Sequence, residues 1–86
     1  MNKKHKFEIV GSLLAEYHWV NEFGALELDK VYWIGTSGQY FVVTRYHRVI
    51  DDLSYESIKY HIYDTIRDIE KSKLYPVEMV NRILYK

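Results

Sequence analysis

The sequence predicts one small α+β domain over residues 1–86, with an N-terminal helix, an antiparallel β-hairpin or three-strand meander, a long amphipathic helix and a short C-terminal helix. Two observations carry this prediction. Apolar residues recur at helical spacing in both halves of the chain, and alternating residues flank a glycine-containing turn between them. A chain of 86 residues has interior for one hydrophobic core, and we find no linker or internal repeat that would divide it.

The N-terminal third is predicted to be helical after a short basic start. Residues 1–6 are rich in lysine and are expected to fray. A helix is predicted over 7–23, with Gly24 as its C-cap, because apolar residues repeat every three or four positions. Gly11 disfavours a helix, so a strand over part of this segment, such as 7–14, stays open as the alternative. The repeat consists of Phe7, Val10, Leu14, Tyr17 and Val20.

A β-hairpin is predicted in the middle of the chain. The segment 31–34 is apolar and rich in β-branched and aromatic residues, and 39–50 alternates between two faces. The sequence Gly-Thr-Ser-Gly at 35–38 joins them and supplies two residues that tolerate a positive φ angle. At 25–29 leucines alternate with acidic residues, which predicts a further short strand.

The strongest helical repeat follows the hairpin and predicts a long amphipathic helix over 55–73. Ser54 is a favourable N-cap, and Leu53 before it can pack against Ile58. The apolar stripe of this helix is expected to cover one face of the hairpin. Its members are Tyr55, Ile58, Ile62, Ile66 and Ile69.

A short helix over 76–85 is predicted to close the domain. Pro76 favours the first helical position, because its missing N–H would have no partner there. The apolar positions expected to face the core are Val77, Val80, Ile83 and Leu84.

Composition and charge argue against several classes of protein. The formal net charge is zero, unlike a strongly basic nucleic-acid binder or an acidic DNA mimic. The chain has no cysteine and therefore no disulfide, thiolate metal site or cysteine nucleophile. Residues 1–6 resemble the start of a signal peptide, but Glu8, Glu16 and His18 interrupt the apolar segment that would have to follow. No apolar run approaches the length of a membrane span, and we expect a cytoplasmic protein without membrane contact.

No motif for catalysis or cofactor binding stands out, so we expect neither an enzyme nor a cofactor. Each serine lacks the flanking glycines of a nucleophile elbow. His61, Asp64 and Asp68 lie three and four residues apart on the predicted long helix, a spacing that could hold a divalent cation. Arg67 and Lys71 lie within reach of the same carboxylates, so we interpret the group as exposed ion pairs and expect no metal site.

The most informative feature of the composition is its aromatic content, with nine tyrosines and two tryptophans in 86 residues. A domain of this size cannot bury every ring, and exposed Tyr and Trp side chains favour recognition of a partner. The candidate protein-binding residues are Trp19, Tyr46, Tyr60 and Tyr63, of which Tyr60 and Tyr63 would share one face of the predicted long helix. The alternative for these rings is packing at the edge of the core.

These observations favour a small non-enzymatic protein-binding module that holds a protein partner, or a second copy of itself, through an aromatic surface. Residue types with AT-rich codons, such as Lys, Ile, Tyr and Asn, are abundant, as in low-GC bacteria and their phages. A phage or mobile-element inhibitor of a host or defence protein, of the anti-CRISPR type, fits this class.

The alternative function is a small DNA- or RNA-binding regulator. Its basic residues would be Lys3, Lys4, Lys6, Arg45 and Arg48, and aromatic neighbours of the two arginines could stack on bases. This hypothesis requires these basic side chains to converge on one surface.

Overall fold

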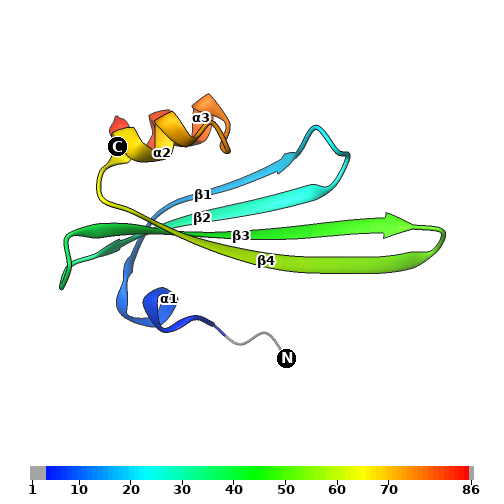
Figure 1. Ribbon diagram of the computed structural model, residues 1–86, viewed down its shortest axis with the longest axis horizontal. Coiled ribbons are helices and arrows are strands. Elements are labelled where there is room, and N and C mark those ends of the chain that lie inside the picture. Colours follow the sequence, from blue (N-terminus) through cyan, green and yellow to red (C-terminus); the bar gives the residue numbers. More distant parts are fainter. Residues whose placement is uncertain (1–3, 86) are drawn as a thin grey trace.

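The computed structural model describes residues 4–85 and arranges them as a four-stranded antiparallel sheet with short helices on both faces (Figure 1). The strand order is β1-β2-β3-β4, so each strand pairs with its neighbours in sequence. One face carries α1 (Lys6–Val10), and the other carries α2 (Ile66–Ser72) and α3 (Val77–Leu84). The strands are β1 (Ser12–Val20), β2 (Leu26–Ile34), β3 (Gln39–Ile50) and β4 (Leu53–Tyr63).

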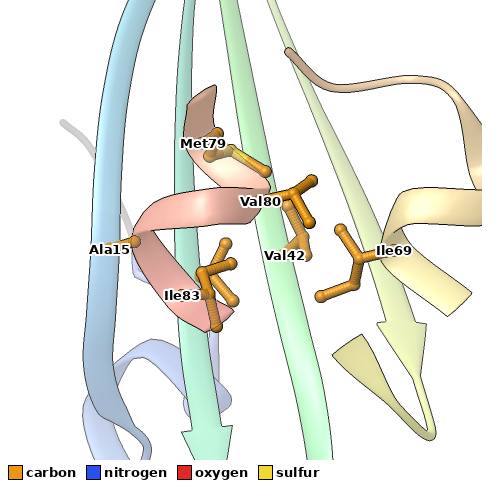
Figure 2. Close-up of a cluster of buried hydrophobic side chains, with 7 residues drawn as sticks. Ala15, Val42, Ile69, Met79, Val80 and Ile83 are labelled. Atoms are coloured by element: carbon orange, nitrogen blue, oxygen red, sulfur yellow. The ribbon is translucent and has the colours of Figure 1, made fainter. Parts of the chain in front are cut away.

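Two hydrophobic layers hold the helices to the sheet, because successive side chains of a strand point to opposite faces. Tyr32 and Phe41 lie in the layer beneath α1, where Phe7 packs against them. Their neighbours Val31 and Val42 lie in the layer beneath α2 and α3. The parts of β2 and β3 next to their connecting turn are therefore covered on both faces. The second layer, much of it drawn in Figure 2, consists of Ala15, Val31, Val42, Ile69, Met79, Val80 and Ile83.

The N-terminal helix predicted over 7–23 is wrong, because only Lys6–Val10 is helical and β1 takes most of the remainder. Gly11 ends the helix. Its N–H donates to the carbonyl oxygen of Phe7 at 2.8 Å, and a Cβ atom there would lie only 2.6 Å from that oxygen. The alternative, a strand over part of this segment, is confirmed with other bounds, since β1 begins only after Gly11 and runs to Val20. Pairing of β1 with β2 outweighs the local helical repeat.

The segment between β1 and β2 is a turn and not the end of a helix. Gly24, predicted as a helix C-cap, lies in this turn with a φ of 75°, and its N–H donates to the carbonyl oxygen of Asn21 at 3.0 Å. The side-chain oxygen of Asn21 accepts hydrogen bonds from the backbone N–H groups of Phe23 and Ala25. One asparagine therefore fixes the whole turn.

The long amphipathic helix predicted over 55–73 is also wrong: β4 occupies Leu53–Tyr63, and only Ile66–Ser72 is helical. β4 pairs with β3 along its whole length, and Ser54, predicted as the N-cap, lies within the strand. Tyrosines and β-branched residues favour a paired strand. Hydrogen bonds to a neighbouring strand thus outweigh the helical spacing of the isoleucines.

The C-terminal helices are short and are held by packing on the sheet. The side chain of Thr65 caps α2 by accepting a hydrogen bond from the backbone N–H of Asp68 at 3.1 Å. Pro76 is the N-cap of α3 and not its first residue. Met79 is fully buried, whereas Val77, predicted to face the core, is 69% exposed. Within residues 4–85 no helix is long and apolar enough to cross a membrane.

The turn between β3 and β4 stores strain that one substitution should relieve. Asp51 and Asp52 have φ angles of 51° and 64°, which is the left-handed backbone of a two-residue hairpin turn and favours glycine. We expect Asp52→Gly to raise the free energy of unfolding by about 1 kcal/mol in urea denaturation. Asp68→Gly, in the first turn of α2, should instead lower it by about 1 kcal/mol, because it loses helix propensity and a negative charge that the helix N-terminus favours. A loss of stability in both variants would contradict this account.

Candidate binding cleft

A cleft of about 800 Å³ opens on the face that carries α2 and α3. Figure 1 shows that β3 and β4 run well beyond these two helices, so the far half of this face has no helix above it. Its walls come from the β1–β2 turn, from the far halves of the strands, and from the connection 73–76 between α2 and α3. The cleft is therefore built from elements that lie far apart in the sequence.

One cross-strand row of residues forms much of the floor. Trp19 lies opposite Glu27, Glu27 opposite Tyr46, and Tyr46 opposite Ser57 across the four strands. Because residues directly opposite in an antiparallel sheet share a face, these four side chains point to the same side. Five aromatic side chains line the cleft and belong to Trp19, Phe23, Tyr46, Tyr55 and Tyr75.

Two acidic side chains are buried beneath these rings. Glu27 is 5% exposed and lines the cleft, and Asp29 is fully buried in the next row of the sheet. The indole Nε1 of Trp19 donates to Glu27 Oε2 at 3.0 Å and to Asp29 Oδ2 at 2.7 Å. The Thr44 hydroxyl donates to Asp29 Oδ1 at 2.7 Å, and Asn21 Nδ2 donates to Glu27 Oε1 at 3.3 Å. Among residues 4–85 neither carboxyl group has a cationic partner, so donors from neutral side chains stabilise the pair.

The environment of this pair keeps Glu27, Tyr46 and Tyr75 protonated near neutral pH. Burial raises the pKa of Glu27 to about 8, and the hydrogen bond and negative charge of Asp29 add to the effect. Burial also raises the pKa of Tyr75, helped by its hydrogen bond with Tyr63. Burial raises the pKa of Tyr46 as well, and the electrostatic effect of Glu27 adds to this rise. Near neutral pH the lining therefore carries neutral tyrosine hydroxyl groups and a neutral Glu27.

The raised pKa of Glu27 predicts how stability depends on pH. Between about 4.5, its ordinary pKa, and about 8, the folded chain holds a proton on Glu27 that the unfolded chain releases. The contribution of Glu27 to the free energy of unfolding is therefore fully present below about pH 4.5 and is lost as the pH rises to about 8. Urea denaturation across this range should show a falling free energy of unfolding, and Glu27→Gln should flatten the curve. Parallel curves for the two proteins would refute the assignment.

The four candidate protein-binding aromatic residues do not form one surface. Trp19 and Tyr46 both line the cleft. Tyr60 lies on the opposite face and stacks on Phe41 with ring centroids 5.6 Å apart. Tyr63 packs beside the core, and its hydroxyl lies 3.2 Å from that of Tyr75. The sequence pattern predicts that Tyr60 and Tyr63 share a helical face. On β4 they lie on opposite faces of the sheet instead, because side chains three residues apart along a strand point to opposite sides.

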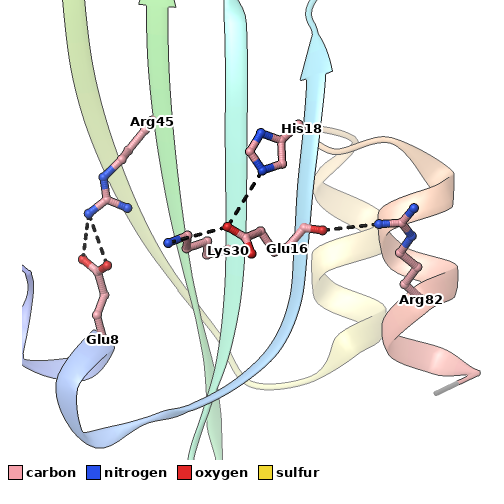
Figure 3. A network of polar contacts seen from close by, with 6 residues as sticks. All are labelled: Glu8, Glu16, His18, Lys30, Arg45 and Arg82. Atoms are coloured by element: carbon pink, nitrogen blue, oxygen red, sulfur yellow. Dashed lines mark hydrogen bonds and ion pairs between the residues drawn. The ribbon is translucent and has the colours of Figure 1, made fainter.

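The basic residues of the nucleic-acid hypothesis are dispersed. Arg45 lies on the α1 face, where its Nη2 contacts both carboxylate oxygens of Glu8 at 3.2 Å (Figure 3). Arg48 lines the cleft on the other face. The Lys6 ammonium group stands 5.2 Å from the ring centroid of Phe7. Lys4 lies at the exposed start of the described chain, and Lys3 lies outside the described residues.

The three residues with metal-ligand spacing in the sequence also lie on different elements of the structure. His61 lies on β4, Asp64 lies in the connection after it, and Asp68 lies in the first turn of α2. They do not share one helical face as the sequence pattern predicts, because no continuous helix joins them.

The sequence pattern misses Glu27 and Asp29 because β2 buries these acidic side chains and exposes Leu26, which is the reverse of the usual arrangement. Leu26 and Leu28 alternate with these acids, which is typical of a strand with leucines inside and carboxylates in water. In the structure Leu26 is 57% exposed and both acids are buried. A strand that buries its acids breaks a local rule, and such breaks are expected at functional sites.

Comparison with protein-family models, curated proteins and solved structures returned no match to this chain. The function is therefore inferred from the cleft and its surroundings.

Proposed function

We propose that the protein is a non-enzymatic binding module and that it holds a segment of a partner protein in the cleft. One observation carries this proposal, namely a cleft of about 800 Å³ whose lining includes five aromatic side chains. Clefts of this size with aromatic walls and a few placed polar groups are the usual form of a binding site. Tyr and Trp side chains are also the ones that contribute most to protein interfaces.

The carboxyl pair supports binding over acid–base catalysis. Glu27 and Asp29 accept hydrogen bonds from the same indole N–H. The other oxygen of Asp29 accepts a hydrogen bond from the Thr44 hydroxyl. Both oxygens of Glu27 also accept hydrogen bonds from neighbouring side chains. The pair is well suited to fix Trp19 in one orientation in the cleft.

The narrower hypothesis is that the partner is a host or defence protein and that the chain is a phage or mobile-element inhibitor acting in the cytoplasm. The small size and the bias toward residues with AT-rich codons support this origin. The absence of cysteine supports a reducing compartment.

A tagged pull-down from a low-GC bacterial lysate, run with and without nuclease, tests the proposal. The wild-type chain is expected to capture a protein that survives nuclease treatment. Tyr55→Ser, which removes a cleft wall, should reduce capture at least about tenfold. Tyr85→Ser is the matched control, because Tyr85 is 82% exposed and does not line the cleft. Equal capture by both variants, or loss of the captured protein on nuclease treatment, would refute the proposal.

A further inference from the structure

We propose that the segment bound in the cleft is acidic, with an uncharged aromatic side chain between the rings and carboxylates meeting Arg48, Lys59 and Lys73. This inference rests on the proposed function and specifies the chemistry of the partner at the same site.

Three cationic side chains surround the cleft without acidic partners. Arg48 comes from β3, Lys59 from β4, and Lys73 from the C-cap of α2. Among the described residues none of the three forms an ion pair. The Lys59 ammonium group lies 5.5 Å from the ring centroid of Tyr46, a contact that leaves its charge available.

Cations elsewhere on the sheet are already paired. On the α1 face Arg45 contacts Glu8 at 3.2 Å. Lys30 lies 3.7 Å from the carboxylate of Glu16, which His18 also approaches (Figure 3). Among the Lys and Arg side chains of the described strands, Lys30 and Arg45 are paired, whereas the unpaired Arg48 and Lys59 both line the cleft.

The acidic residues near the opening do not cancel these charges. Glu56 also lines the cleft, but its side chain alternates to the opposite side of β4, where its carboxylate lies 3.3 Å from His47. Glu27 is largely protonated near neutral pH. Glu22, in the β1–β2 turn, is the one remaining exposed acid among the described lining residues, against three cations. The rim of the cleft, formed by Arg48, Lys59 and Lys73, is therefore positively charged. Charge complementarity favours an acidic segment there.

The floor sets a different requirement from the rim. The Asp29 carboxylate is fully buried and accepts hydrogen bonds from Trp19 and Thr44, so it needs no cation from a partner. A carboxylate pushed to this depth would be repelled by Asp29. An aromatic side chain instead gains contact with the rings and can hydrogen bond to Glu27. An acidic segment with an uncharged aromatic centre satisfies both requirements.

Three capped pentapeptides with a central tyrosine test the inference, with flanks of Asp and Glu, of Asn and Gln, or of Lys and Arg. A short single-stranded oligothymidylate serves as the nucleic-acid probe. At low salt the acidic peptide should bind at least about tenfold more tightly than the neutral one, and the basic peptide more weakly still. The difference should shrink at about 0.5 M salt, where screening acts over a few ångströms.

Charge variants identify the residues responsible. Arg48→Gln and Lys59→Gln should each remove most of the preference for the acidic peptide, while circular dichroism shows an intact fold. Lys71→Gln is the matched control, because Lys71 is exposed on α2 and does not line the cleft. Equal effects of all three substitutions would overturn the inference.

The outcomes separate this inference from the proposed function. If the neutral peptide binds as tightly as the acidic one, and Tyr55→Ser abolishes binding of both, the acidic segment is wrong and the cleft remains the site. If the oligothymidylate binds more tightly than every peptide, or if no peptide binds, the acidic segment is overturned. Capture of a protein partner through Tyr55 then decides the proposed function separately.

Discussion

Replacing Glu8 with alanine is expected to lower the free energy of unfolding by about 3–5 kcal/mol. The Glu8 side chain is 1% exposed, and both of its carboxylate oxygens accept hydrogen bonds from Arg45 on β3 (Figure 3). Its Oε1 also accepts from the backbone N–H of His5, which closes the capping box of α1. Loss of the carboxylate leaves Arg45 half-buried without a partner and removes the polar contact between α1 and the sheet.

Urea denaturation of the wild type, Glu8→Ala and Glu78→Ala checks this expectation. Glu78 is exposed in the first turn of α3, so its truncation should change stability by no more than about 0.5 kcal/mol. A Glu8→Ala variant within about 1 kcal/mol of the wild type would show that the pair contributes little.

Replacing Ile69 with alanine is expected to cost about 2–5 kcal/mol. Ile69 is the buried residue of α2 and is fully inaccessible to solvent, packed in the layer that contains Val42 and Met79 (Figure 2). Ile69 is the one buried residue of α2, so no second buried side chain of this helix would keep it packed on the sheet. Because α2 leads into the connection 73–76, the same substitution should loosen one wall of the cleft.

The control for this core substitution is Ile9→Ala, since Ile9 is 70% exposed on α1. It should change the free energy of unfolding by about 0.5 kcal/mol or less. Similar losses in the two variants would mean that α2 is not anchored through Ile69.

Local sequence information predicts the centre of the sheet. The turn at 35–38 joins β2 to β3, and Gly38 adopts a φ of 71° there, as expected from a glycine-containing turn between two alternating segments. The information needed lies within about twenty residues, so pattern and turn chemistry agree.

Sequence patterns fail where the structure depends on partners far along the chain. The isoleucines of 55–63 have helical spacing, but β3 offers an open edge that the segment fills as β4. The two aspartates before it resemble a helix start and instead form the hairpin turn. In the same way, pairing with β2 draws Ser12–Val20 away from the predicted helix.

The candidate site is predictable only in part. Trp19 and Tyr46 stand out as surplus aromatic residues, and the cleft contains both. Tyr75 reaches it from the α2–α3 connection, which no local pattern places beside the sheet. Glu27 and Asp29 are hidden by their alternation with leucines, because that pattern predicts them in water.

The most direct test of the cleft as the binding site follows the two tryptophan indole N–H signals by ¹⁵N NMR while the captured partner is added. Trp19 lies in the cleft and its N–H donates to the buried carboxyl pair, whereas Trp33 does not line the cleft. On binding, the Trp19 signal should shift and the Trp33 signal should stay in place. Binding that leaves the Trp19 signal unchanged would contradict the cleft as the binding site.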